Sequence, residues 1–144
     1  MKEDLINKKY FSSSVEQTEE IGYNIGKALE KGDIIAFSGN LGAGKTALTR
    51  GIAKGIGYDG EVTSPTYTIL QIYDGLISLC HFDMYRVESK EDLISTGFFD
   101  YLDDEMCMAI EWSENIAFAL PKNVIKINIS YGETENDRII EVGD

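Results

Sequence analysis

Hydrophobic residues in the first part of the chain recur at the three- and four-residue spacing of an amphipathic helix. Ser14 followed by Gln17 matches a capping box, so the helix is expected to begin there. Gly32 is the expected stop, because glycine commonly ends helices. The hydrophobic face of this helix consists of Val15, Ile21, Ile25, Ala28 and Leu29.

The pattern then changes to an uninterrupted apolar run at residues 34–37, within a predicted strand at 33–37. Such a run is typical of a strand that is buried on both faces, as in a parallel sheet. Leu48, Ile52 and Ile56 are spaced four apart and predict a second helix from Lys45 to about Ile56, closed by Gly57. A glycine-containing segment therefore joins a buried strand to a helix.

Strands dominate the second half of the pattern. Two strand-like runs on either side of Asp74-Gly75 predict a β-hairpin, and Ser89 is expected to cap a helix that ends near Gly97. Further apolar runs at residues 106–110, 124–129 and 138–142 are predicted strands. The alternation predicts an α/β fold with a mainly parallel central sheet, flanked by helices and carrying an antiparallel β-hairpin insertion.

Composition is typical of a soluble protein, with 43% hydrophobic and 26% charged residues. The 144 residues are expected to form a single domain, 1–144. No apolar stretch approaches the ~20 residues of a membrane span, and the first residues lack the apolar centre of a secretory signal. Cys80 and Cys107 have no metal-type spacing, so they are expected to be buried, reduced thiols. We therefore expect a cytoplasmic protein without membrane contact.

The charge balance argues against one class of partner. The formal net charge is −12, from 25 acidic and 13 basic residues. Nucleic-acid affinity depends largely on Lys and Arg side chains that displace counterions. Direct binding of RNA or DNA by this chain alone is therefore not expected.

The glycine-containing segment carries the strongest motif. Gly39–Thr46, "GNLGAGKT", matches the P-loop pattern between the strand and the helix that such a loop requires. Backbone N–H groups of a P-loop surround phosphate oxygens, and the helix N-terminus adds its positive dipole end. Lys45 is expected to reach the β- and γ-phosphates and Thr46 to bind Mg²⁺. The expected phosphate-binding residues are Asn40, Leu41, Gly42, Ala43, Gly44, Lys45 and Thr46.

The identity of the nucleotide base is predicted from the absence of a sequence motif. Guanine-specific P-loop proteins generally carry Asn-Lys-x-Asp on a later strand, and this chain has no such element. ATP is therefore the expected nucleotide, and the fold class is a P-loop NTPase.

Hydrolysis also requires an acid near the metal ion and a group that positions water. Glu111 ends the apolar run "MCMAIEW" where a Walker B strand usually has Asp, so it could bind the metal through water, position the attacking water, or do both. Alternatively it is a solvent-facing glutamate. Asp83 in "HFDMYR" is the second candidate for the metal, or has a structural role. His81 is interpreted as a packed or hydrogen-bonded histidine, not a catalyst.

A threonine in the loop after the second helix is a candidate sensor. Thr66 lies in "TSPT", where P-loop switches sense the γ-phosphate through a hydroxyl. The same residues also suit an ordinary proline-containing turn.

Together, "GNLGAGKT", "SPTYT", "HFDMYR" and "EW" resemble, in order and spacing, the bacterial TsaE (YjeE) ATPase family of tRNA threonylcarbamoyladenosine biosynthesis. The resemblance extends from about Thr18 to Arg138. It implies a small ATPase that works with the TsaB and TsaD proteins, and activates or resets their transferase. It further implies that Thr46 and Glu111 hold Mg²⁺ and that Thr66 is the switch hydroxyl. Residues that it places near the nucleotide are Trp112, Thr18 and Arg138.

Two other functions remain open. A small-molecule kinase could use the same loop, although three scattered arginines, Arg50, Arg86 and Arg138, make a poor phosphate-covering lid. A binding module could hold ATP without turnover. Because no arginine lies close to the P-loop in sequence, hydrolysis is expected to be weak in isolation and to be stimulated by partners.

Overall fold

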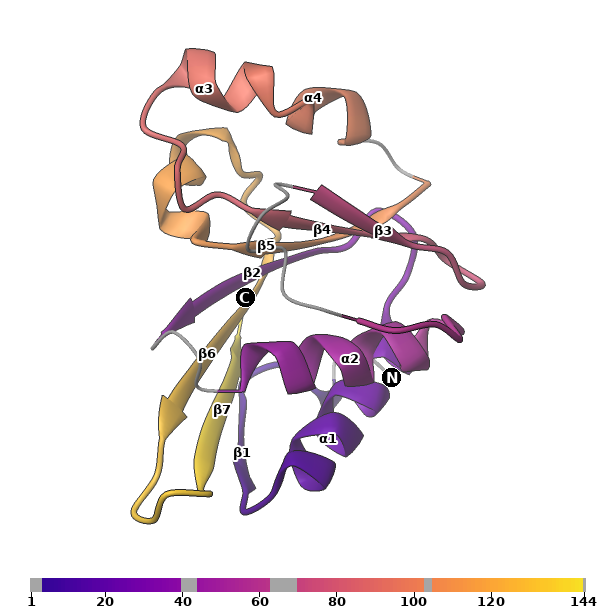
Figure 1. Ribbon diagram of the computed structural model, residues 1–144, viewed down its shortest axis with the longest axis vertical. Helices are drawn as coiled ribbons and strands as arrows, with labels where there is room; N and C mark the ends of the chain where they lie inside the picture. Colours follow the sequence, from indigo (N-terminus) through magenta and orange to yellow (C-terminus); the bar gives the residue numbers. More distant parts are fainter. Residues whose placement is uncertain (1–3, 40–43, 63–69, 103–104, 144) are drawn as a thin grey trace.

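The computed structural model describes residues 4–39, 44–62, 70–102 and 105–143. The chain forms an α/β structure around one sheet (Figure 1). In chain order, the elements are β1 (Lys8–Ser12), α1 (Val15–Ala28), β2 (Ile34–Gly39), α2 (Lys45–Gly55), β3 (Leu70–Tyr73), β4 (Leu79–Asp83), α3 (Lys90–Ser95), α4 (Phe98–Tyr101), β5 (Cys107–Glu111), the 3-10 helix η2 (Ser113–Ala119), β6 (Ile125–Tyr131) and β7 (Arg138–Gly143).

The sheet has a parallel centre and antiparallel edges, with the strand order β1-β7-β6-β2-β5-β4-β3 in the described part of the chain. Strands β6, β2, β5 and β4 run parallel to their neighbours in this centre. Strand β3 pairs antiparallel with β4, β7 with β6, and β1 with β7. The expected parallel centre and antiparallel hairpin are therefore present, but the sheet as a whole is mixed, because β7 and β1 add two further antiparallel pairings. The residues between β6 and β7 are too few for the crossover that a parallel pair requires.

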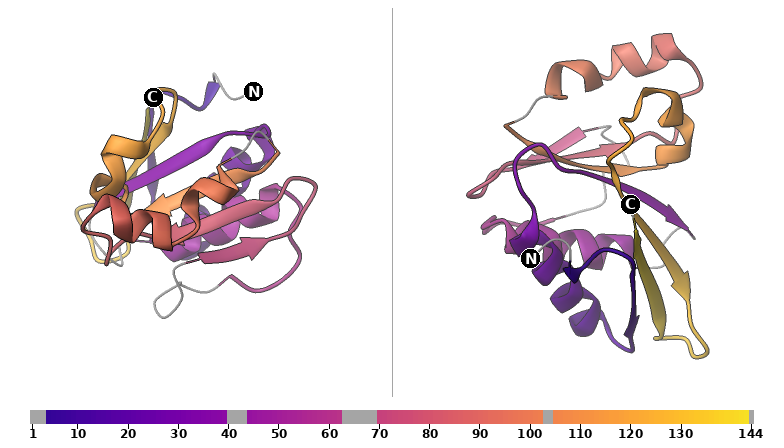
Figure 2. Two further views of the ribbon diagram at one scale, coloured as in Figure 1. Left: turned by 90° about the horizontal axis from the view of Figure 1, so that it is seen from above. Right: turned by 180° about the vertical axis from the view of Figure 1, so that it is seen from behind.

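Helices cover both faces of the central strands (Figure 1, Figure 2). On one face, α1 and α2 pack on hydrophobic residues that include Phe37, Leu48 and Ile127. On the other face, α3, α4 and η2 pack on a second cluster that includes Phe82, Phe98 and Ile110. The buried run in β2 contributes alternately to both clusters, as expected for a strand that is covered on both sides.

Helix α1 begins where the sequence predicts and ends earlier. The backbone N–H of Gln17 donates to Ser14 Oγ at 3.1 Å, which confirms Ser14 as the N-cap. The helix stops at Ala28, because Leu29 turns to an extended conformation and buries its side chain. Gly32, the expected stop, instead adopts φ 91° in the following turn, where its N–H donates to the Met106 carbonyl at 3.1 Å.

The predicted hairpin is present, with a connection longer than a two-residue turn. Tyr73 pairs with Leu79, which leaves five residues, 74–78, between β3 and β4. Gly75 serves close packing here, since a Cβ at this position would lie 2.5 Å from the Ile56 carbonyl oxygen. The N–H of Leu76 donates to the same oxygen at 2.7 Å, which attaches the hairpin to the end of α2.

Several further expectations can be compared with the structure. Ser89 caps α3 through the N–H of Asp92 at 3.1 Å, and both cysteines are buried, with no disulfide joining them. Strand β1 and helices α4 and η2 have no counterpart in the predicted elements. In the part of the chain that the structure describes, no helix has both the length and the apolar character needed to cross a membrane.

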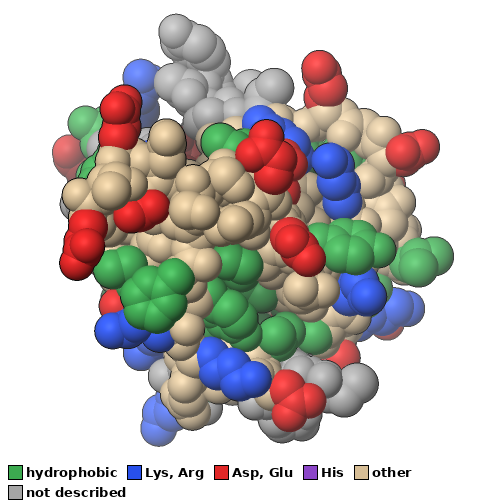
Figure 3. Space-filling model, turned by 90° about the horizontal axis from the view of Figure 1, so that it is seen from below, with side chains coloured by type: hydrophobic (Ala, Val, Ile, Leu, Met, Phe, Trp, Pro, Cys, Tyr) green, Lys and Arg blue, Asp and Glu red, His purple; other side chains and the backbone are tan. Residues whose placement is uncertain are grey.

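The surface over α1 and β1 is partly hydrophobic. Figure 3 shows hydrophobic side chains gathered on the underside of the molecule, with acidic side chains around them. Phe11, Val15 and Tyr23 are exposed on these elements. Leu5, Tyr10 and Ile21 help to line a hollow of about 370 Å³ beside them.

Candidate functional site

The start of α2 is the first component of the site. Gly44 precedes the helix with φ 105°, a conformation that a side chain would disfavour, and Lys45 follows it. Lys45 is only 6% exposed although it carries a charge. The first turn of a helix leaves backbone N–H groups available to an anion. Four of the predicted loop residues, Asn40, Leu41, Gly42 and Ala43, lie outside the described residues, as does Thr66.

The two candidate acids lie side by side at the same edge of the sheet. Strands β4 and β5 are parallel neighbours, and their register places Asp83 directly beside Glu111. Strand β5 also pairs in parallel with β2, the strand that leads toward α2. The carboxyl ends of three adjacent strands therefore meet where ligands commonly bind in α/β folds.

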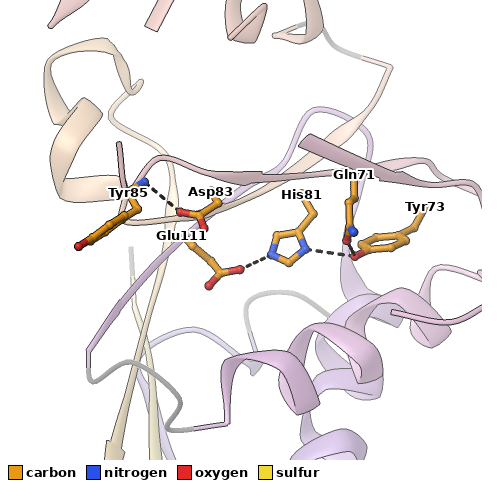
Figure 4. A network of polar contacts seen from close by, with 6 residues as sticks. All are labelled: Gln71, Tyr73, His81, Asp83, Tyr85 and Glu111. Atoms are coloured by element: carbon orange, nitrogen blue, oxygen red, sulfur yellow. Dashed lines mark hydrogen bonds and ion pairs between the residues drawn. The ribbon is translucent and has the colours of Figure 1, made fainter. Parts of the chain in front are cut away.

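A chain of hydrogen bonds holds Glu111 from the side of the hairpin (Figure 4). His81 Nε2 lies 2.7 Å from Glu111 Oε2, and His81 Nδ1 lies 3.3 Å from the Tyr73 hydroxyl. The Tyr73 hydroxyl is also 2.5 Å from Gln71 Oε1. His81 is 1% exposed, so the interpretation as a hydrogen-bonded, packed histidine is confirmed. The sequence did not indicate that Gln71 and Tyr73 belong to the candidate site, because nothing in their sequence surroundings distinguishes them from other strand residues.

Burial and nearby charges act on the acids and on Tyr73. Burial raises the pKa of Asp83, and the Glu111 carboxylate raises it further. The Tyr85 N–H, which donates to Asp83 Oδ1 at 2.9 Å, acts in the opposite direction, as do His81 and Lys45. Burial raises the pKa of Tyr73 to about 12, with smaller contributions from Tyr58 and Glu111. Lys45 and the two acids therefore influence one another electrostatically.

Trp112, directly after Glu111, is half-buried and not a residue of the fully buried core. It adopts φ 58° and ψ 41°, a left-handed conformation that is uncommon for a bulky residue and often marks functional sites. Lys45 Nζ lies 6.0 Å from the centroid of its ring, and the Tyr85 ring lies 4.9 Å away. The tryptophan is thus beside the lysine of the predicted P-loop.

Thr18 and Arg138, which are distant in sequence, both lie beside Gly44. A Cβ on Gly44 would be 3.8 Å from Thr18 Cγ2 and 3.9 Å from Arg138 Nε. The expectation of no arginine close to the P-loop is therefore wrong, because Arg138 lies beside Gly44 in space and Arg50 follows Thr46 by four positions in the sequence.

Both of these side chains have protein partners. Thr18 Oγ1 lies 2.7 Å from Ser12 Oγ, and Ser12 donates its own proton to the Ser14 carbonyl. Arg138 Nη1 donates to the carbonyls of Glu135 and Asp137 at 2.7 and 2.8 Å. The hydroxyl of Thr18 is thus used as a donor inside the protein, and Arg138 is held in place.

The donor set suits Mg²⁺ that is shared with phosphates. Asp83, Glu111 and Thr46 offer carboxylate and hydroxyl oxygens, the ligands that this ion prefers. Within the described ranges, no three His, Cys, Asp or Glu side chains converge on a point that could hold a metal. Two carboxylates without a complete cage fit the way that Mg²⁺ binds beside a nucleotide.

Comparisons with known proteins agree with one another. A family model described as "Threonylcarbamoyl adenosine biosynthesis protein TsaE" matches residues 12–140. A relative from Treponema pallidum, described as tRNA threonylcarbamoyladenosine biosynthesis protein TsaE, is 37% identical over 118 residues, which are 82% of this chain and 87% of the relative. A Bacillus subtilis protein with the same description is 37% identical over 123 residues, covering 84% and 76%. The crystal structure of Bacillus subtilis YdiB matches with a TM-score of 0.78 and 29% identity, over 92% of this chain and 82% of that one.

Proposed function

Since the chain belongs to the TsaE family of tRNA threonylcarbamoyladenosine biosynthesis proteins, we propose that it binds ATP with Mg²⁺ and hydrolyses it as an accessory subunit of that machinery. Hydrolysis activates or resets the transferase formed by the TsaB and TsaD proteins. This role places the protein in the cytoplasm and leaves contact with the tRNA to its partners. We propose that the protein has the fold of a P-loop NTPase.

One observation carries this proposal. Asp83 and Glu111 are register partners at the carboxyl ends of β4 and β5, and the buried Lys45 lies against Trp112 next to Glu111. A cation at a helix N-terminus opposite two carboxylates is the arrangement that phosphoryl transfer requires on the protein side. A module that only holds ATP would not need the second acid.

Each side chain has a separate role in this proposal. Lys45 and the N–H groups at the start of α2 bind the phosphate oxygens. Thr46, Asp83 and Glu111 would hold the metal ion. When bound, Mg²⁺ neutralises charge on the phosphates. Glu111 also orients the attacking water and accepts its proton. Burial raises the pKa of Asp83, so keeping its carboxylate ionised in the free protein costs free energy.

The proposed dependence of ATP hydrolysis on partner proteins follows from the contacts that Arg50 and Arg138 already make. Arg50 is paired with Glu19 at 2.8 Å, and the Nη1 donor of Arg138 is used by backbone carbonyls. An arginine that stabilises the transition state raises phosphoryl-transfer rates by about a thousandfold or more. We infer slow basal turnover and stimulation by the TsaB–TsaD pair.

Phosphate release with and without that pair tests the proposal. Glu111→Gln should retain ATP binding, because Lys45 and the helix N-terminus remain, and should lose basal and stimulated turnover. Glu114→Gln is the matched control, since Glu114 is an exposed acid in the first turn of η2. Wild-type turnover in Glu111→Gln would contradict the role of Glu111. Phosphate that appears on an added metabolite would favour the kinase, and unchanged ATP would favour the binding module.

Nucleotide binding can be measured independently of turnover. Trp112 is the single tryptophan of the chain, so its fluorescence reports this site alone. Mg-ATP should change its intensity or wavelength. Lys45→Ala should abolish the change and the heat of binding in calorimetry, because it removes the cation that reaches the phosphates. Wild-type affinity in that variant would overturn the phosphate site.

A further inference from the structure

We propose that His81 is a positioning residue that fixes the orientation of the Glu111 carboxylate through its Nε2–H group. The inference rests on the proposed role of Glu111 in hydrolysis and assigns a function to a histidine that this role leaves unused. His81 lies on β4 between Gln71 of β3 and Ala109 of β5 in the sheet register. It is therefore held on both sides by neighbouring strands.

The contact with Glu111 is short and largely shielded from water. The Nε2···Oε2 distance is 2.7 Å, and the two side chains are 2% and 12% exposed. Charge-assisted hydrogen bonds have this length and are roughly twice as strong as neutral ones. In Figure 4 the imidazole lies between Glu111 and Tyr73, with one ring nitrogen directed toward each.

The charge state of His81 decides whether Nδ1 accepts or donates a hydrogen bond. If His81 is neutral, Tyr73 donates to Nδ1, the amide of Gln71 turns its NH₂ toward the tyrosine oxygen, and Nε2–H donates to Glu111. If His81 is charged, Nδ1–H donates to Tyr73, Tyr73 donates to Gln71 Oε1, and Nε2–H again donates to Glu111. Both arrangements give the imidazole and tyrosine protons an acceptor, and in both Nε2 carries a proton that is directed at Glu111.

This contact occupies one oxygen of Glu111 and leaves the other for reaction. A glutamate side chain has several rotatable bonds, and a misplaced catalytic group costs large factors in rate. With Oε2 held by His81, Oε1 is the oxygen that faces water or metal. Tyr73 and Gln71 fix the imidazole in turn, so the positioning extends to β3.

A measurement on the free protein tests the contact itself. His81 is the only histidine in the chain, so ¹⁵N-labelled histidine gives one pair of imidazole signals. We expect a protonated Nε2 whose attached proton exchanges slowly with water, and loss of that protection in Glu111→Ala. An unprotonated Nε2 in the wild-type protein would overturn the proposal, whether or not the protein hydrolyses ATP.

Three substitutions test the consequence for turnover. His81→Gln can place an amide N–H near the former Nε2, whereas the shorter amide of His81→Asn lies near Nδ1 and does not reach Glu111. His81→Leu has no donor. We expect kcat to fall about 10- to 100-fold in the Asn and Leu variants, as for other residues that orient a reacting group. KM should remain unchanged, and the Gln variant should be close to wild type.

The outcomes separate this inference from the proposed function. Thermal unfolding and affinity for a non-hydrolysable ATP analogue show which variants fold and bind. Wild-type kcat in a folded Leu or Asn variant would refute positioning while hydrolysis stands. Equal losses in all three folded variants would also refute it, because rescue by the donor is the signature. A wild-type protein without turnover even in the presence of the TsaB–TsaD pair would refute the proposed function, and the imidazole signals would still decide the contact.

Discussion

The two helical layers of the molecule are held by different kinds of contact. Helices α1 and α2 touch through their backbones: a Cβ on Gly22 would lie 2.3 Å from the Leu48 carbonyl oxygen, and one on Gly51 would lie 2.1 Å from that of Glu19. Gly26 and Gly55 make equally close contacts one turn further on. On the opposite face, the short helices α3 and α4 contact the sheet through aromatic side chains, with the Phe82 and Phe98 rings 5.7 Å apart.

The layer with backbone contacts is the layer that carries part of the proposed site. Helix α2 presents Lys45 at its start, so a small displacement of this helix would move the lysine relative to Asp83 and Glu111. Backbone contacts cannot adjust in the way that side chains change rotamer. The layer that carries the proposed phosphate site is thus the less adjustable one, and the α3–α4 layer can accommodate changes in its side chains.

The largest expected effect is at the contact between α1 and α2. Gly51→Ala adds one methyl group that would overlap the backbone of Glu19, so the helices must separate. We expect a loss of about 3 kcal/mol in the free energy of unfolding, and a fall of roughly 10 °C in Tm. Urea and thermal unfolding measure both. Gly143→Ala is the control, because its Cβ would have an ordinary 3.9 Å contact with Asn7, and a similar loss in both variants would contradict the comparison.

A change of similar volume in the other layer should cost less. Phe98→Leu removes part of a fully buried ring that packs against Phe82 and Phe99, and the leucine can repack among flexible neighbours. We expect about 1.5 kcal/mol, half the cost of Gly51→Ala. Equilibrium unfolding of the two variants under identical conditions gives the ratio. A loss for Phe98→Leu that exceeds the loss for Gly51→Ala would reverse the assignment of the less adjustable layer.

The polar part of the α1–α2 face should show a pH dependence. Tyr73→Phe removes the hydroxyl that contacts His81 and Gln71, at a cost of about 1 kcal/mol near pH 7. Burial raises the pKa of Tyr73 from 10.0 to about 12 in the folded protein. The unfolded chain therefore ionises first, and the wild type loses stability as the pH rises from 10.0 toward 12.

The phenylalanine variant lacks the titration of Tyr73. The difference in the free energy of unfolding between the wild type and the variant should therefore narrow as the pH rises from 10.0 toward 12. Urea unfolding at several pH values measures this difference in the free energy of unfolding, and tyrosines that do not interact with Tyr73 contribute equally to both proteins. A constant difference across the range would mean that the Tyr73 hydroxyl is not buried as the structure has it.

The smallest effects are expected at the helix caps. Ser14→Ala and Ser89→Ala each remove one side-chain acceptor at a helix start. We expect about 1 kcal/mol for Ser14, because α1 unfolds together with the core. For Ser89 we expect about 0.5 kcal/mol, since the six-residue α3 can fray by itself. Hydrogen exchange should then increase in residues 90–95 only in Ser89→Ala, and equal global losses would show that α3 is as firmly coupled as α1.

Much of the local structure could be predicted from the chain. Ser14 and Ser89 mark helix starts because a capping hydrogen bond joins residues three apart, and the buried runs of β2 and β5 need no distant information to be recognised as strands. Gly44 adopts φ 105°, a backbone conformation that glycine tolerates and that the glycines of the motif lead one to expect. Strand β1, "KKYFS", was missed because its pattern is largely polar and its pairing with β7 comes from the other end of the chain.

Other features of the candidate site come from contacts between segments that lie far apart. Register alone places Asp83 beside Glu111, and packing alone brings Thr18 and Arg138 to Gly44, about 26 and 94 positions away in the chain. The glycines of α1 and α2 are visible in the sequence, but their purpose appears only when the two helices cross. Periodicity and motifs describe neighbours along the chain, and so the sequence by itself determined most of the elements and the P-loop motif. Strand order, register and helix contact depend on energies shared between distant segments, and these decided which side chains lie beside Gly44 and Glu111.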